Sequence, residues 1–69
     1  MRISARNQLK GTVVSVTRGP INALVKLDLG NGQHLTATLT ADAVEDLGVA
    51  EGVEVVAIFK ASSVLLGVD

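Results

Sequence analysis

Residues 21–29 alternate between apolar and polar side chains more clearly than any other part of this chain. The apolar positions on one face are Ile21, Ala23, Val25, Leu27 and Leu29. Successive side chains of a strand point to opposite faces, so the pattern predicts a strand with one buried face. Gly30-Asn31-Gly32 follows directly, and Asn-Gly is typical of a tight hairpin because both residues tolerate positive φ. The segment therefore constrains the chain to an antiparallel sheet.

Four more segments are predicted to be strands from the same period-two pattern. They are residues 9–17, 33–39, 53–60 and 63–68. The first ends at Arg18-Gly19-Pro20, where glycine and proline favour a turn. In residues 33–39 the inward positions are Leu35, Ala37 and Leu39.

The spacing of apolar residues changes over residues 40–48, and the new pattern predicts one short helix. Thr40 can cap its start, Asp42 suits the positive N-terminal end, and Gly48 suits the position after the last turn. The stripe that we expect to be buried consists of Ala43, Val44 and Leu47.

The predicted fold class is all-β. Five strands with a helix between the third and the fourth give a small OB-fold-like barrel. Residues 1–69 contain no linker, repeat or low-complexity stretch, so we expect one domain.

The chain is small and apolar for a protein that folds alone. A domain of about 60 residues buries only about 60% of its unfolded surface, and disulfides, metals or oligomerisation usually support it. This chain has no cysteine and one histidine, is 48% hydrophobic, and has a mean hydropathy of +0.46. We therefore expect a homo-oligomer. Outward apolar residues, which we take as subunit interface or as covered by loops and the helix, are Val14, Leu24, Val56, Ile58 and Leu65.

Several function classes are disfavoured. The net charge of −1 lacks the basic excess of a nucleic-acid binder, and Phe59 is the only aromatic residue available for base stacking. No apolar run reaches the length of a membrane span, and the N-terminus lacks the apolar stretch of a signal peptide, so we expect a cytoplasmic protein. His34 is a lone histidine on an outward face, no residues suggest a catalytic triad, and we expect neither a metal site nor an enzyme.

Two polar tracts lie near opposite ends of the sequence. The first is Ser-Ala-Arg-Asn-Gln-Leu-Lys-Gly at residues 4–11, and the second is Phe-Lys-Ala-Ser-Ser-Val at residues 59–64. Both carry cationic and hydroxyl donors, and neither contains a carboxylate. Such a set suits a small anion that only accepts hydrogen bonds.

These two tracts closely resemble those of the molbindins, the small molybdate-binding Mop proteins. Their domain, often called TOBE, also occurs in molybdate-responsive regulators and in ATPases of molybdate transporters. The resemblance extends over essentially the whole chain. It implies the OB-like fold and a hexamer built as a trimer of dimers. It also implies that the protein binds molybdate and, as a second ligand, tungstate.

Within the tracts, the candidate oxyanion-binding residues are Ser4, Arg6, Lys60, Ala61 and Ser62. Arg6 can present two N–H groups to two oxygens, although a surface arginine can equally pair with a carboxylate. Lys60 supplies a point charge or is an ordinary strand-end lysine. Ala61 stands where some relatives carry serine, so any contact there comes from its backbone.

Two further positions have alternative interpretations. Thr40 is a helix cap by its position, and the resemblance implies that it also reaches an oxyanion held by the neighbouring subunit. A secondary oxyanion site on the trimer axis is implied for the turn Gly19-Pro20-Ile21-Asn22, which is otherwise an ordinary hairpin turn. Asn22 stands where a relative carries threonine.

The leading hypothesis is a non-catalytic molybdate- and tungstate-binding protein with sites between subunits. Its role in intracellular molybdenum storage and homeostasis is implied by the family alone. The alternative is an oxyanion-sensing module for protein–protein interaction.

Overall fold

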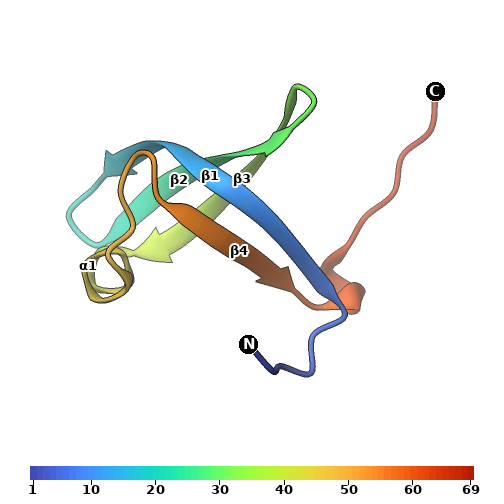
Figure 1. Cartoon of the computed structure of the whole chain (residues 1–69), viewed down its shortest axis with the longest axis horizontal. Helices are drawn as coiled ribbons and strands as arrows, with labels where there is room; N and C mark the ends of the chain where they lie inside the picture. Colours follow the sequence, from blue (N-terminus) through green and yellow to red (C-terminus); the bar gives the residue numbers. More distant parts are fainter.

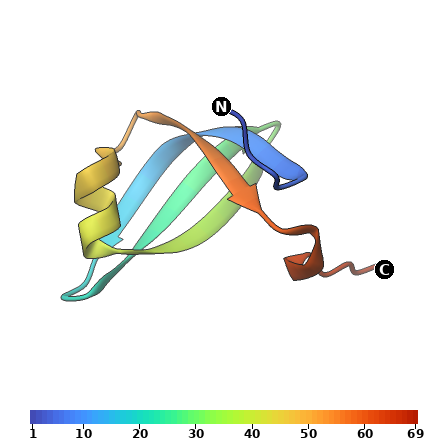
Figure 2. The same ribbon diagram turned by 90° about the horizontal axis from the view of Figure 1, so that it is seen from below.

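Three consecutive strands form two hairpins in the computed structural model, which describes residues 1–69. β1 spans Asn7–Arg18, β2 spans Asn22–Gly30 and β3 spans Gln33–Thr40. β4, at Glu54–Phe59, pairs with the other side of β1, so the sheet has the order β3-β2-β1-β4 with antiparallel neighbours throughout. The sheet is strongly curled, and the single α-helix lies at one end of it (Figures 1 and 2). The predicted strands 9–17, 21–29, 33–39 and 53–60 are confirmed with small shifts of their ends.

The turn between β2 and β3 has the predicted tight geometry. Asn31 and Gly32 have φ angles of 53° and 77°, the left-handed region that a two-residue turn of this kind requires. The Asp28 Oδ1 atom accepts a hydrogen bond of 2.8 Å from the Gly30 N–H. This local chemistry sets the register that pairs Leu27 with Leu35.

β1 bends in its middle and serves two partners. Its first half, from Asn7 to Thr12, pairs with β4, and its second half, from Thr12 to Arg18, pairs with β2. The register shifts between Val13 and Ser15, which is a β-bulge, and bulges bend a strand and increase its twist. The bend curls the sheet and brings its outer strands, β3 and β4, toward each other.

The core is small. Only six of 69 residues are buried, namely Val13, Ala23, Val25, Leu27, Val44 and Val49. The predicted inward face of β2 is confirmed at its three central positions. It is wrong at Ile21, which is 73% exposed, because the strand begins one residue later and Ile21 lies in the turn. There its carbonyl accepts a hydrogen bond of 2.7 Å from the Ala41 N–H.

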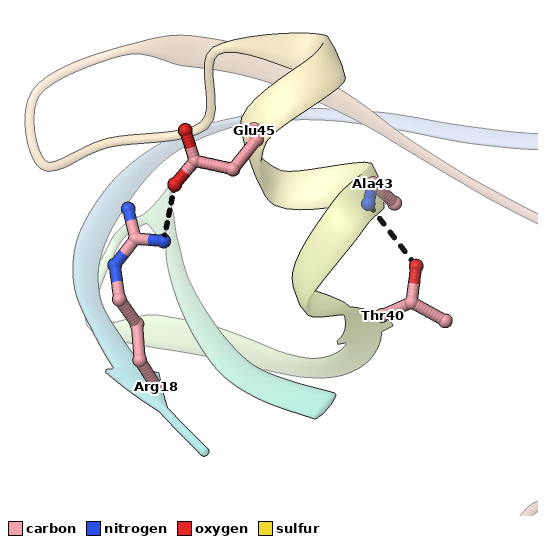
Figure 3. A network of polar contacts seen from close by, with 4 residues as sticks. All are labelled: Arg18, Thr40, Ala43 and Glu45. Atoms are coloured by element: carbon pink, nitrogen blue, oxygen red, sulfur yellow. Dashed lines mark hydrogen bonds and ion pairs between the residues drawn. The ribbon is translucent and has the colours of Figure 1, made fainter. Parts of the chain in front are cut away.

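Helix α1 spans Ala41–Leu47 and has the predicted caps. The Thr40 Oγ1 atom accepts a hydrogen bond of 3.1 Å from the Ala43 N–H (Figure 3), and Gly48 ends the helix with φ 67°. Val44 is buried as predicted. The prediction for Leu47 is wrong, since it is 72% exposed at the margin of an apolar groove between β3 and β4. No helix of the chain is long and apolar enough to cross a membrane.

The predicted fifth strand, residues 63–68, is not a strand in the single chain. After β4 the chain makes a short 3₁₀ turn, η1, at Ala61–Ser63, closed by bonds from Ser63 N–H to Lys60 O and from Val64 N–H to Ala61 O. This turn directs the remaining residues away from the sheet, where they have no strand to pair with (Figure 1). The sheet therefore has four strands, and the five-stranded OB-fold arrangement stays a prediction.

Candidate oxyanion-binding site

A shallow cavity lies at the end of the sheet where the chain enters β1 and leaves β4. It has a volume of about 530 Å³, and its walls come from residues 3–6 and 58–62. Five of the six predicted primary site residues line it, namely Ser4, Arg6, Lys60, Ala61 and Ser62. The two polar tracts, far apart in the sequence, thus meet in one place.

Strand pairing explains why they meet. β1 and β4 are antiparallel, and Asn7 is paired with Phe59 at the end of the ladder. Arg6 immediately precedes this pair and Lys60 immediately follows it. In an antiparallel ladder such flanking residues lie at the same end, so the register alone places the two cations side by side.

The cavity carries donors and no carboxylate. Its lining includes one guanidinium, one ammonium and two hydroxyl groups, and no Asp or Glu. Neither Arg6 nor Lys60 forms an ion pair. The ion pair of the structure joins Arg18 to Glu45 at 2.9 Å and lies beside α1 (Figure 3). The alternative that Arg6 pairs with a surface carboxylate is therefore not what the structure shows.

The 3₁₀ turn contributes backbone donors to the same wall. Ala61 and Ser62 are its first two residues, and the leading N–H groups of a helical turn have no partner within it. Lys60 precedes the turn, and no side chain caps it. Ala61 can donate a hydrogen bond only through its backbone N–H group, because its methyl side chain has no donor.

Gln8 holds the first tract in place. Its Nε2 atom donates a hydrogen bond of 3.3 Å to the Ala5 carbonyl, between Ser4 and Arg6. The apolar part of the wall comes from Ile3, Ile58 and Phe59, which sequence reasoning did not assign to the site. The only indication in the sequence was their position, with Ile3 and Ile58 next to the polar tracts and Phe59 at the start of the second one.

The five lining residues with predicted roles are all exposed. A single chain therefore covers an anion on one side only. Hydrogen bonds to charged groups strengthen when water is excluded, and the cavity of the single chain is open to water.

Thr40 lies at the other end of the sheet, beside α1 (Figures 1 and 3). It is paired with Asn22 in the ladder of β2 and β3, and the Ile21 carbonyl bonds the next residue, Ala41. The structure thus joins Thr40 to the turn at residues 19–22, and not to the cavity of the same chain. In that turn the Gly19 N–H donates a bond of 2.8 Å to the Asn22 carbonyl.

These features describe a small all-β domain that presents hydrogen-bond donors at one end of a curled sheet. The chain belongs to the TOBE domain family, which matches residues 3–66. It is 51% identical over 69 residues to a probable molybdenum-pterin-binding protein of Haemophilus influenzae, and the alignment covers all of both chains.

Solved structures agree with the fold. MopII from Clostridium pasteurianum superposes with a TM-score of 0.91 at 43% identity, covering 97% of this chain and 100% of that one. The cytoplasmic molybdate-binding protein ModG, solved with molybdate bound, gives a TM-score of 0.94 at 45% identity. All of this chain is covered there, and 49% of ModG. The resemblance of the sequence to Mop proteins is thereby confirmed.

Proposed function

We propose that this protein binds molybdate, without catalysis, at the cavity between residues 3–6 and 58–62. The observation that carries the proposal is a cavity with two cations, two hydroxyl groups and no carboxylate. The relatives named as molybdenum-pterin-binding and molybdate-binding proteins support the choice of ligand.

The chemistry follows from the ligand. Molybdate presents four acceptor oxygens and no proton at neutral pH, so every group that faces it should donate. Arg6 offers a planar fork of N–H groups to two oxygens, and Lys60 adds a mobile point charge. The hydroxyl groups of Ser4 and Ser62 and the N–H groups of Ala61 and Ser62 complete the donor set.

A donor-only site also discriminates between anions. Phosphate is partly protonated at neutral pH, and its O–H group would face another donor without an acceptor. An unsatisfied pair of this kind costs binding energy. Tungstate has the same charge and shape as molybdate and should bind as well, whereas sulfate differs chiefly in size.

The binding site is completed by a second copy of the chain in this proposal. Thr40 cannot reach the cavity of its own chain, but it is exposed at the other end of the sheet and can reach that of a neighbour. The small core and the exposed apolar residues support a homo-oligomer. The proposed assembly is a hexamer, a trimer of dimers, in which each single-domain subunit contributes to sites at its interfaces.

The turn at residues 19–22 is proposed as a secondary oxyanion site near the trimer axis. Gly19 already uses its N–H group, and Pro20 has none. The donors that remain include the N–H group of Ile21 and the side-chain amide of Asn22. This set is neutral, so the site should bind more weakly than the cavity with Arg6 and Lys60.

The proposed role is storage and homeostasis of molybdenum in the cytoplasm. The description of ModG as a cytoplasmic molybdate-binding protein supports the location. Binding to nucleic acid or membranes has no place in this role. The alternative role, an oxyanion-sensing interaction module, would use the same cavity with a protein partner reading its occupancy.

Isothermal titration calorimetry with molybdate, repeated in excess sulfate and in excess phosphate, tests the proposal. We expect binding that persists in both competitors, with tungstate equivalent to molybdate. Absence of heat and of thermal stabilisation by molybdate would refute it and favour an interaction module that needs no anion. Loss of the signal in phosphate would refute the donor-only argument.

A further inference from the structure

The turn between β2 and β3 projects from the body of the protein, away from α1 (Figure 1). Its two residues, Asn31 and Gly32, are both exposed. Asparagine is one of the chemically labile residues of proteins, because its side-chain carboxamide can react with the main-chain nitrogen of the residue that follows. The tip of the hairpin therefore presents a labile side chain to water.

Asn31 differs from the other two asparagines of the chain in the residue that follows it. Asn7 and Asn22 are the first residues of β1 and β2, and they precede glutamine and alanine. The alanine, Ala23, is 2% exposed, so the core covers it. Only Asn31 precedes a glycine, and only there does no side chain obstruct the approach of the main-chain nitrogen.

The main-chain nitrogen of Gly32 is not engaged in a hydrogen bond. Gly32 lies outside the strands, and its N–H group is absent from the backbone hydrogen bonds that turns and loops make. The Asp28 carboxylate accepts its bond from the Gly30 N–H group instead. An exposed N–H group without a partner exchanges its proton with water far more readily than one in a strand ladder. The nucleophile that deamidation needs, the deprotonated nitrogen, is therefore accessible at Gly32.

The Asn31 carboxamide is equally unrestrained. It takes part in none of the side-chain hydrogen bonds of the structure. Beyond its neighbours in the chain, no atom lies within 4 Å of the place where a Cβ atom of Gly32 would stand. A reaction between two groups of one chain is fast when they can approach each other without obstruction. Here the two groups are adjacent in sequence and nothing else packs against the glycine.

We infer that Asn31 is a site of spontaneous deamidation in the folded protein. Hydroxide removes the proton of the Gly32 N–H group, and the nitrogen attacks Cγ of Asn31. The new N–Cγ bond forms, the Cγ–Nδ2 bond breaks, and ammonia leaves with a proton from water, which regenerates hydroxide. The product is a cyclic succinimide.

Water then opens the succinimide at one of its two carbonyl groups. Cleavage of the N–Cγ bond gives aspartate at position 31 and restores the original main chain. Cleavage of the bond between the Gly32 nitrogen and the main-chain carbonyl carbon gives isoaspartate. In isoaspartate the main chain runs through Cβ and Cγ, so the turn gains one backbone atom.

The isoaspartyl form should loosen the hairpin. The length of a two-residue turn fixes the register of its strands, and here that register pairs Gly30 with Gln33 and Leu27 with Leu35. The oxyanion cavity is formed by residues 3–6 and 58–62, so the modification does not touch it. The inference therefore does not depend on the proposed function.

A rigid turn could instead protect Asn31 by holding the nitrogen of Gly32 away from Cγ. The structure argues against protection, because neither residue of the turn makes a backbone hydrogen bond that such a motion would break. Glycine also adopts a wide range of main-chain angles at little cost. Comparison of the folded and the unfolded chain tests this alternative.

The first test measures deamidation at all three asparagines in one sample. Trypsin cleaves after lysine and arginine, and so places Asn7, Asn22 and Asn31 in separate fragments, 7–10, 19–26 and 27–60. Folded protein is kept warm at mildly alkaline pH and sampled over time by mass spectrometry. The mass of fragment 27–60 should rise by the difference between –OH and –NH₂, at a rate on the order of tenfold or more above that of the other two fragments.

Two controls assign the reaction to the folded turn. Asn31→Gln keeps a carboxamide but lengthens the side chain, and it should abolish the change in fragment 27–60. An unchanged rate in this variant would overturn the assignment to Asn31. Equal rates at the three asparagines would overturn the inference. So would a fragment 27–60 that reacts in urea and stays intact in the folded protein.

The second test examines the products. Isoaspartate is detected by an isoaspartate-specific methyltransferase, which transfers a labelled methyl group from S-adenosylmethionine to the new carboxylate. The isoaspartyl form, separated by ion exchange, should unfold roughly 4–8 °C below the unmodified protein, the shift that a modest loss of stability causes in a small domain. Asn31→Asp has the added charge with a normal main chain and should unfold close to the unmodified protein. Aged protein without methyl acceptance would overturn the isoaspartyl product, and equal midpoints of all three forms would overturn its effect on the hairpin.

Discussion

Replacing Arg6 by alanine should weaken molybdate binding strongly and leave the fold unchanged. Arg6 lines the cavity, is exposed, and takes part in no ion pair or hydrogen bond within the chain. Its removal therefore costs the folded protein little, within about 0.5 kcal/mol, as is usual for surface substitutions. Its contribution should appear almost entirely when the anion is bound.

The magnitude follows from the number of bonds lost. A hydrogen bond to a charged group contributes about 1.5–3 kcal/mol, and a guanidinium can give two to neighbouring oxygens. Arg6 is exposed to solvent, so we take the lower value of about 1.5 kcal/mol for each of the two hydrogen bonds. Losing both weakens molybdate binding by roughly 3 kcal/mol, which corresponds to an increase of about 100-fold in Kd. Arg6→Lys keeps the charge but loses the fork, and should cost about tenfold.

Calorimetry on Arg6→Ala, Arg6→Lys and Lys26→Ala separates this contact from a general charge effect. Lys26 is exposed in β2 and outside the cavity, so Lys26→Ala removes the same charge and should leave Kd within about twofold. Equal losses for Arg6→Ala and Lys26→Ala would refute a specific contact. An unchanged Kd for Arg6→Ala would remove Arg6 from the site.

Three further substitutions test other parts of the account. Lys60→Ala should raise Kd roughly tenfold or more without a change of assembly; loss of the oligomer at unchanged affinity, measured by light scattering and calorimetry, would reassign Lys60 to the interface. Thr40→Asp keeps a good helix cap and should preserve thermal stability, yet repel an anion held by a neighbouring copy and lower molybdate affinity; unaltered affinity would leave Thr40 a cap alone. Gly32→Ala should destabilise the fold by roughly 1 kcal/mol in urea unfolding, because Gly32 has φ 77°; an unaffected midpoint would contradict the turn geometry.

Local patterns predicted the strands, the hairpin and the helix because these depend on neighbours in the same chain. Each of these features is determined by the residue types within a few positions of it. Examples are the alternation of β2, the turn at Asn31-Gly32, and the helix caps at Thr40 and Gly48. The prediction failed at Ile21 because the strand begins one residue later than the alternation suggests. The predictions also failed for the fifth strand and for Leu47. Both involve apolar residues that the single chain leaves exposed, because no other part of the chain packs over them.

The candidate site could likewise be predicted in part from the sequence. The donor-only character of the two tracts is visible in the sequence, and the pairing of Asn7 with Phe59 brings them together. What pattern reasoning could not supply was the apolar wall at Ile58 and Phe59, since such residues serve equally in a core. It also could not place Thr40, because only the assembled sheet shows that α1, which Thr40 caps, lies at the end opposite the cavity (Figure 1).

The most direct measurement is the position of the bound anion. Crystals grown with molybdate can be measured at a wavelength where molybdenum scatters anomalously, so that the map marks the metal without reference to the protein. We expect a strong peak in the cavity between Arg6 and Lys60, with Thr40 of a neighbouring copy close to it. A peak elsewhere on the protein, or no peak in crystals that contain excess molybdate, would contradict the central claim.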